Sequence, residues 1–289
     1  MNSTSSFDFF HQNEIFESDL ALERRRASTY VEGVDYKRDV CLGGVWERLK
    51  ITSVAGEKNI GRPMGLYDTL NVPRMDDILP DDIEDAKDEV ARELCRMCDL
   101  CDIAPSRILV IGLGNRELTP DAIGPASAME VEATMHIKAS DIDLFESLGC
   151  SEICVLCPDV TANSGMKAAD IIKGVADKVK PSLIIAIDSL ASRSTERLGT
   201  TIQVSSTGII PGTGLGYSGT AIDENLLGVP VIAVGVPTVI NSKILFEDQS
   251  AGRRSPSLFV SPKGINRMVK NAAKIIGGGI NQAFGMCYY

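Results

Sequence analysis

The second half of the chain alternates short apolar runs with longer amphipathic segments. Short runs rich in Val, Ile and Leu are typical of strands that are buried on both faces of a parallel sheet. Five such runs lie within residues 106–112, 151–158, 181–188, 200–205 and 228–237. Each run is predicted to form a strand.

Amphipathic segments separate or follow these runs. In residues 165–180 the apolar side chains recur at helical spacing, and residues 265–284 end the chain with a second helical segment. Residues 120–137 are expected to be partly helical after their Pro and Gly breaks. Strands that alternate with helices predict an α/β fold with a mostly parallel central sheet flanked by helices.

The first half has a different pattern. Residues 38–79 carry apolar and β-branched side chains between Gly and Pro breaks, which predicts strands and turns. Residues 81–100 predict an amphipathic helix, and its acidic first turn suits the positive end of the helix dipole. Residues 1–19 are polar with scattered aromatics, which predicts a flexible arm. We therefore expect an N-terminal strand-rich extension of the α/β unit.

Composition and charge narrow the class of protein. The chain has 289 residues, 44% of them hydrophobic, and a net charge of −10, which argues against bulk electrostatic binding to nucleic acid or anionic membranes. No apolar run reaches the roughly 18 residues of a membrane span. The first 20 residues contain acidic but no basic side chains, unlike a secretory signal. We expect a cytoplasmic protein.

Cysteine spacing raises the question of a metal cluster. Two groups of three stand out, Cys95, Cys98 and Cys101, and Cys150, Cys154 and Cys157. The second spacing is one that an iron–sulfur cluster can use. However, the first group falls on a predicted helix and the second on a predicted strand, which favours packing positions over a cluster.

Two further cofactor motifs are incomplete. In "VIGLGN", Gly112 and Gly114 fit the first two positions of a dinucleotide-binding fingerprint, but the third position is Glu117, whose charge would face the pyrophosphate. The only histidines are His11 and His136, too few for a His-rich zinc site.

Two carboxylates are the strongest candidates for chemistry. Asp188 ends the apolar run 181–188, and open α/β sheets bind ligands at the carboxyl ends of their strands. Asp121 follows the first predicted strand of the same sheet. Close together, the two would share a proton, so that one could activate water while the other polarises an amide. Position alone favours the other interpretation, in which both are capping residues.

Three long motifs resemble the spore germination protease family, which digests small acid-soluble spore proteins. They are "VIGLGNRELTPDAIGP", "IIAIDSLASRSTERLGTTIQVSSTGIIPGTGLG" and "LGVPVIAVGVPTVI". The likeness is dense over residues 105–241 and resumes near the C-terminus. It implies an atypical endopeptidase with a fold similar to that of hydrogenase maturation proteases. It also implies a homotetramer in the spore core.

The resemblance implies that Asp121 and Asp188 are the essential aspartates. In hydrogenase maturation proteases the corresponding carboxylates hold a metal, but no third ligand can be placed here, so we prefer an aspartate pair without a cofactor. A metal-dependent peptidase in the same cleft stays an alternative. So does a binding protein of the same fold that has lost catalysis.

The family also implies a self-cleaving zymogen. Its cleavage site is Ser or Thr, Asp or Glu, an apolar residue and then Ala, which "SDLA" at residues 18–21 matches. Cleavage between Asp19 and Leu20 would make residues 1–19 a propeptide and residues 20–289 a single peptidase domain. Acid could trigger the cut by protonating Asp19.

Other segments give candidate substrate contacts. The loop 208–220 carries Gly212, Gly214 and Gly216, whose backbone groups could pair with a peptide or hold an oxyanion, although a tight turn is an equal interpretation. Arg193 could orient the aspartates or the substrate, or form a surface ion pair. Residues 242–258 are shorter than in longer family members, which puts substrate range and oligomer contacts in doubt.

Overall fold

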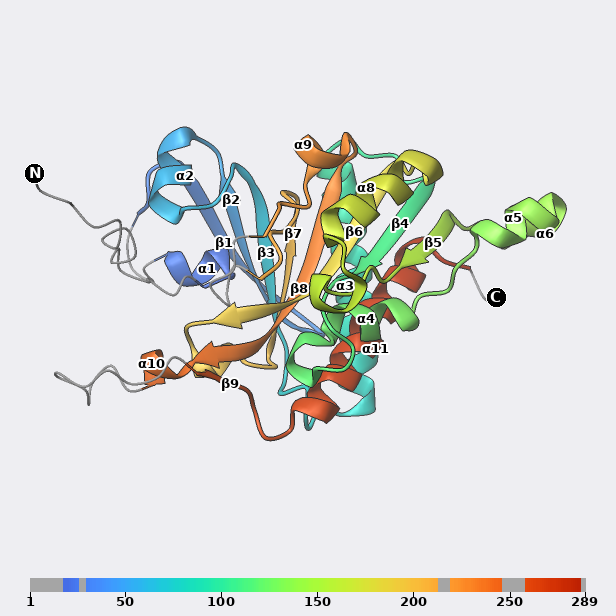
Figure 1. Cartoon of the computed structure of the whole chain (residues 1–289). Coiled ribbons are helices and arrows are strands. Elements are labelled where there is room, and N and C mark those ends of the chain that lie inside the picture. The colour runs from blue at the N-terminus through green and yellow to red at the C-terminus, as the bar shows by residue number, and fades with distance from the viewer. Residues whose placement is uncertain (1–17, 26–29, 213–218, 246–257, 287–289) are drawn as a thin grey trace, which may run out of the picture.

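The computed structural model describes residues 18–25, 30–212, 219–245 and 258–286. Within these residues nine strands form one sheet (Figure 1). The strands are β1 (Val34–Cys41), β2 (Gly44–Ile51), β3 (Gly65–Asn71), β4 (Arg107–Gly112), β5 (Glu152–Leu156), β6 (Leu183–Ser192), β7 (Thr201–Ser205), β8 (Val231–Asn241) and β9 (Phe259–Val260). Their order is β1-β2-β3-β7-β8-β6-β4-β5, and β9 pairs with the end of β8.

The predicted α/β class is confirmed. Strands β8, β6, β4 and β5 run parallel, and they form the part of the sheet that the apolar runs predicted. The predicted strand-rich extension is the antiparallel meander β1-β2-β3, which joins the same sheet through β7. Strand β7 is antiparallel to both of its neighbours, so it is the seam between the two parts.

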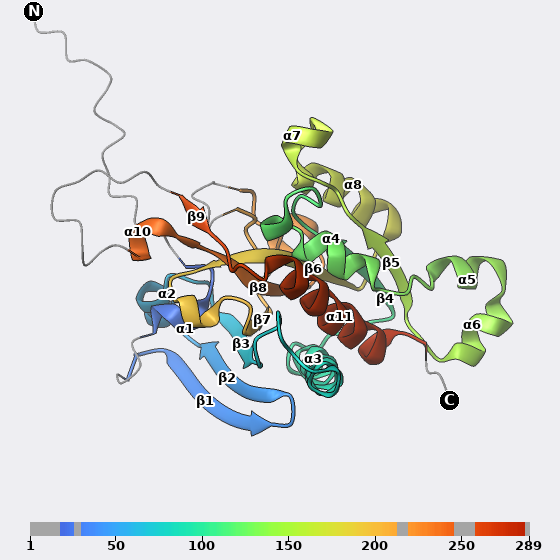
Figure 2. The same ribbon diagram turned by 90° about the horizontal axis from the view of Figure 1, so that it is seen from below.

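Helices cover one face of the sheet along most of its width. They are α3 (Pro80–Leu100), α4 (Ile123–Met129) and α11 (Ile265–Phe284). The helices bury their apolar stripes against alternate residues of the central strands, such as Ile185 and Ile187 of β6, in the largest core cluster. Figure 2 shows α3 and α11 side by side below the sheet. The predicted helices 81–100 and 265–284 are therefore both present.

The opposite face is covered in two separate places. Helices α8 (Ala168–Val179) and α9 (Glu224–Leu227) lie over β4, β6 and β8. Helices α1 (Ala21–Arg24) and α2 (Val54–Ile60) lie over β2 and β3. Between these two groups of helices lie the side chains of β6, β8 and β7 that point to this face of the sheet, and the candidate site is formed there.

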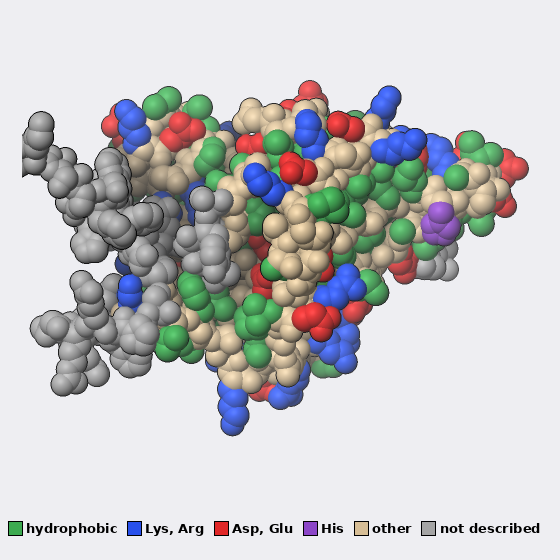
Figure 3. Space-filling view, viewed as in Figure 1, with side chains coloured by type: hydrophobic (Ala, Val, Ile, Leu, Met, Phe, Trp, Pro, Cys, Tyr) green, Lys and Arg blue, Asp and Glu red, His purple; other side chains and the backbone are tan. Residues whose placement is uncertain are grey.

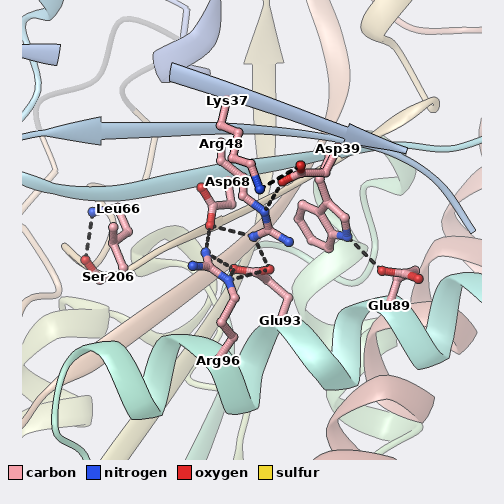
Figure 4. Close-up of polar contacts among 10 residues, drawn as sticks. Lys37, Asp39, Arg48, Leu66, Asp68, Glu89, Glu93, Arg96 and Ser206 are labelled. Carbon is pink, nitrogen blue, oxygen red and sulfur yellow. Dashed lines mark hydrogen bonds and ion pairs between the residues drawn. The ribbon is translucent and has the colours of Figure 1, made fainter. Parts of the chain in front are cut away.

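Buried ion pairs tie the N-terminal strands to α3 (Figure 4). Arg48 of β2 lies 3.0 Å from Asp68 of β3 and also contacts Glu93 of α3. Arg96 of α3 pairs with the same two carboxylates. Burial, followed by the nearby Glu93, raises the pKa of Asp68 to about 7.

The remaining helices are short. They are α5 (Met135–Ser140), α6 (Ile142–Leu148), α7 (Thr161–Ser164), α10 (Ser242–Leu245) and the 3-10 turns η2 (Thr119–Asp121) and η3 (Thr195–Arg197). Helices α5 and α6 project beyond the β5 edge of the sheet (Figures 1 and 2). Of the helices within the described residues, none combines the length and the apolarity that crossing a membrane requires.

Candidate active site

Asp188 lies within a strand rather than at its end. Strand β6 continues past the apolar run to Ser192, because residues 189–192 keep pairing with β8. The expectation that Asp188 ends its strand is therefore wrong. Its side chain is on the face that α8 covers, between Ala186 and Leu190, and is only 4% exposed.

Asp121 is brought to the same place by the turn that follows β4. It is the last residue of η2, and its Oδ2 accepts a hydrogen bond of 2.8 Å from the backbone N–H of Asn115. The turn is fixed to both neighbouring strands. Thr238 of β8 donates to the Pro120 carbonyl at 2.6 Å, and the Ile123 N–H donates to Ser189 Oγ of β6 at 3.3 Å.

Two glycines allow this close approach. Gly114 has φ +106°, and a Cβ there would lie 2.2 Å from the Asp121 carbonyl oxygen. Gly124 opens α4 directly against the strands, and a Cβ there would lie 2.1 Å from the Leu113 oxygen and 2.4 Å from the Ile187 oxygen. The glycines near "VIGLGN" thus serve helix packing and the placement of Asp121.

Both candidate carboxyls hold their protons unusually well. The pKa of Asp188 is raised well above its usual range, first by burial, then by the negative charge of Asp121 and, less strongly, by that of Asp19. Burial also raises the pKa of Asp121, while the Asn115 N–H lowers it. Two carboxyls that disfavour each other's ionisation share a proton over a wide pH range.

Cavities open on both sides of this pair. One of about 260 Å³ is lined by both aspartates together with Asp19 and Phe259. The other, of about 630 Å³, is lined by both aspartates and by the segment that leads into α8, including Lys167. Figure 3 shows acidic side chains deep in a hollow near the centre of this face. The arrangement leaves room for a peptide to pass over the two carboxyls.

The predicted cleavage site is docked beside the aspartates. Ser18, Leu20 and Ala21 are buried, and Leu20 is 0% exposed. The Asp19 N–H donates to the Ala191 carbonyl at 3.0 Å, and the Ala191 N–H donates to Asp19 Oδ2 at 2.9 Å. The expected flexible arm is therefore wrong for residues 18 and 19, because these backbone pairs hold them on β6. Residues 1–17 lie outside the described ranges.

The side chains of Arg62 and Gln203 also bind residues 18–21. Arg62 donates to the Ser18 carbonyl at 2.9 Å and lies 3.6 Å from Asp19 Oδ1. The Gln203 amide straddles Leu20, since its Nε2 donates to the Asp19 carbonyl at 3.4 Å and its Oε1 accepts from the Ala21 N–H at 3.0 Å. The carbonyl of the predicted scissile bond thus has a side-chain donor.

Strand register relates Gln203 to Asp188. Both pair with Gly235 of β8, one from each side, so their side chains leave the same face of the sheet. Two strand spacings separate their Cα atoms by roughly 10 Å. Leu190 contacts Gly235 between them, and it lines both the cavity of about 260 Å³ at the aspartates and a smaller cavity of about 80 Å³ that Gln203 lines. The bond held by Gln203 is therefore beside the aspartates rather than directly on them.

The other predicted substrate contacts differ in where they lie relative to the aspartates. Gly212 lines both cavities at the aspartates, whereas Gly214 and Gly216 lie outside the described residues. The Arg193 side chain is exposed, and its backbone N–H binds Glu23. A substrate-binding role for these residues stays a prediction.

Arg62 and Gln203 were not predicted from the sequence. Gln203 had a signal, because a polar amide in the otherwise apolar run 200–205 requires a partner when buried. Arg62 had none, since only the fold brings it to the segment. Among the described residues, no three Cys, His, Asp or Glu side chains converge as metal ligands, so the aspartate pair does not fit a three-ligand site.

A family model and the relatives of known name point to one family. The family described as germination protease matches residues 12–250 of this chain. A germination protease of Caldanaerobacter subterraneus is 35% identical, and the match covers 92% of this chain and 93% of that protein. A germination protease of Clostridium perfringens is 32% identical and covers 92% of this chain and 94% of its own length. Among solved structures, a NiFe hydrogenase maturation protease from Thermococcus kodakarensis is 16% identical, covering 63% of this chain and 99% of its own, with a TM-score of 0.37.

Proposed function

The chain belongs to the germination protease family, and we infer that it is an endopeptidase that degrades small acid-soluble spore proteins during germination. It works in the spore core as a homo-oligomer, and Asp121 and Asp188 activate the attacking water. The observation that supports this best is a pair of carboxyls with raised pKa values that line the same two cavities.

The different surroundings of the two carboxyls suggest their roles. Asp188 is the more buried, and its pKa is raised further, so it keeps the shared proton. Each carboxyl accepts one backbone N–H, Asp121 from Asn115 and Asp188 from Ser189, so the difference in burial decides, and the less buried Asp121, which ionises more readily, is the general base.

The reaction then proceeds in two steps. Asp121 takes a proton from water as the oxygen bonds to the peptide carbonyl carbon, and Asp188 gives its proton to the carbonyl oxygen. When the C–N bond breaks, Asp121 passes its proton to the leaving nitrogen, and Asp188 recovers its proton from the new carboxyl group. Both aspartates return to their starting state.

The docked segment supports a self-cleaving zymogen. Residues 18–21 match the family's cleavage pattern, and Asp19 among them lines the same cavity as the two aspartates. The bond between Asp19 and Leu20 is cut after the segment moves from Gln203 towards the dyad, by which we mean Asp121 and Asp188. The negative charge of Asp19 is one cause of the raised pKa of Asp188, so mild acid, which keeps Asp188 protonated, favours that movement. Equal cleavage rates of the purified zymogen at mildly acidic and neutral pH would contradict this trigger.

Intact mass measured over time tests the function. The wild-type chain is expected to lose residues 1–19, whereas Asp121→Asn and Asp188→Asn chains keep them and retain the wild-type circular dichroism spectrum. Asp177→Asn, an exposed change of the same kind in α8, is the matched control. Undiminished processing by Asp188→Asn would refute the dyad. Inhibition by a chelator that a divalent ion reverses would favour the metal-dependent alternative, and tight substrate binding without cleavage would indicate a binding protein.

A further inference from the structure

Glu23, four residues after the predicted cut, is held by a separate set of donors. Its Oε1 accepts from Ser192 Oγ at 2.5 Å and from the Ser194 N–H at 3.2 Å, and its Oε2 accepts from the Arg193 N–H at 2.7 Å. The Arg197 guanidinium lies 3.9 Å away. The Glu23 side chain is only 6% exposed. We call these four groups the carboxylate clamp.

The clamp is built independently of the segment that it holds. The Ser194 N–H also donates to Ser192 Oγ at 2.9 Å, which closes the turn locally. Arg197 is supported from the N-terminal meander, since it lies 3.5 Å from Glu47 and 3.3 Å from Asn71 Oδ1. Ser192 ends β6, the strand that carries Asp188, and Ser194 and Arg197 follow it, so one segment of the chain joins the clamp to Asp188.

The clamp and Gln203 together fix the register of the docked segment before cleavage, and residues 18–20 then move towards the dyad while Glu23 stays in the clamp. Gln203 grips the backbone on both sides of Leu20, and the clamp grips the side chain of Glu23 one helical turn later. In a helical turn, a shift of one residue rotates a side chain by about 100°. A carboxylate at the third or fifth position after the cut therefore points away from the clamp.

We propose that the carboxylate clamp is a specificity subsite for an acidic side chain at the fourth position after the cleaved bond. It holds Glu23 while the zymogen is intact, and it takes the corresponding residue of a substrate once residues 20–25 have left. This inference rests on the proposed peptidase function. It adds the requirement that the substrate carries its carboxylate at the fourth position after the cleaved bond.

Cleavage itself favours the departure of the segment. The cut converts the Leu20 N–H into an ammonium group at a residue that is fully buried. Burial of a charge is far less favourable than burial of an amide that already has a partner. The new N-terminus is therefore driven towards solvent, which opens the clamp.

Synthetic peptides with the sequence of residues 14–25 test the subsite. One carries Glu at the fourth position after the cut, one carries Gln there, and one carries the Glu at the third position instead. We measure kcat/KM with the processed wild-type enzyme and peptide affinity, by fluorescence anisotropy, with the processed-length Asp188→Asn chain. Hydrogen bonds to a charged group are strong, so the Glu peptide is expected to be preferred by about 10- to 100-fold in both assays.

Variants of the clamp identify the groups responsible. Ser192→Ala and Arg197→Gln are each expected to reduce the preference for Glu over Gln, whereas Lys178→Gln, an exposed change of equal charge in α8, preserves it. Thermal unfolding checks that each variant is folded. If the Arg197→Gln variant is not folded, the result for Ser192→Ala alone decides the test. Equal cleavage and equal binding of the Glu and Gln peptides would overturn the subsite and leave the peptidase function standing. Cleavage of none of the peptides would overturn the proposed function and the subsite with it.

Discussion

The contact between α4 and the sheet predicts a severe effect from a single methyl group. In a Gly124→Ala chain, the new Cβ would lie 2.1 Å from the Leu113 oxygen and 2.4 Å from the Ile187 oxygen. Carbon and oxygen atoms approach no closer than about 3.3 Å even in favourable contacts, so α4 must retreat by roughly 1 Å. Both obstacles are backbone atoms, one directly after β4 and one within β6, and neither can rotate away.

The structure sets the expected size of the effect. Overpacking of a core costs about 1–3 kcal/mol, and two backbone collisions place this substitution at about 3 kcal/mol. In a chain of this size, each kcal/mol lowers the melting temperature by about 2–4 °C, so a fall of roughly 6–12 °C is expected. Asp121 lies two residues before the first residue of α4, and a displacement of this size at the proposed catalytic group is expected to cost about 100-fold in rate.

The assay compares two helical glycines. A Cβ at Gly174 of α8 would meet open space, with no neighbouring side chain or strand within 4 Å, so Gly174→Ala is the matched control. It is expected to stabilise the chain by roughly 0.5–1 kcal/mol. Melting followed by circular dichroism and loss of residues 1–19 followed by mass spectrometry are measured on both variants. A Gly124→Ala chain that melts and processes like the wild type would show that this approach does not position Asp121.

Three further predictions follow from the charged groups. Arg62→Gln removes the partner of Asp19 and of the Ser18 carbonyl, so mass spectrometry should show processing slowed by about 10-fold; an unchanged rate would exclude Arg62 from segment binding. Asp121→Asn removes a negative charge next to Asp188 and should lower its pKa, which the infrared carboxyl band of Asp188 reports during titration, and an unmoved band would contradict their coupling. Because the pKa of Asp68 is raised to about 7, its contribution to the free energy of unfolding is fully present below the unfolded value of about 4 and is lost as the pH rises through about 7. Urea unfolding across this range should therefore show a weaker fall with pH for Asp68→Asn than for the wild type, and parallel curves would contradict the raised pKa.

Much of the fold was accessible from periodicity alone. The predicted helices 81–100 and 265–284 correspond to α3 and α11, because a long apolar stripe is a local property of the sequence. The end of β6 was not accessible in the same way. The sequence after Asp188 loses its apolar character, yet residues 189–192 remain in the strand because β8 provides partners for them. Pairing between distant segments decides such boundaries.

The candidate site was likewise only partly predictable from the sequence. Asp121 and Asp188 could be singled out because motifs surround them. The groups that hold residues 18–23 come from α2's end, β6 and β7, and only the sheet order brings them together. Strand β7 is inserted antiparallel between β3 and β8, which places Gln203 level with Asp188 across the sheet. No local sequence pattern predicts that insertion.

The burial of Ala21 and Leu22 has a kinetic consequence. These side chains belong to the small apolar cluster with Leu49, Ile51 and Tyr67 over β2 and β3, so after the proposed cut they would keep an affinity for this cluster beside the candidate site. A freed end that stays covalently attached competes with substrate at a local concentration in the millimolar range. Newly processed enzyme should therefore show a lag before full turnover, and dilution should not shorten the lag, because the competitor is tethered to the site that it blocks.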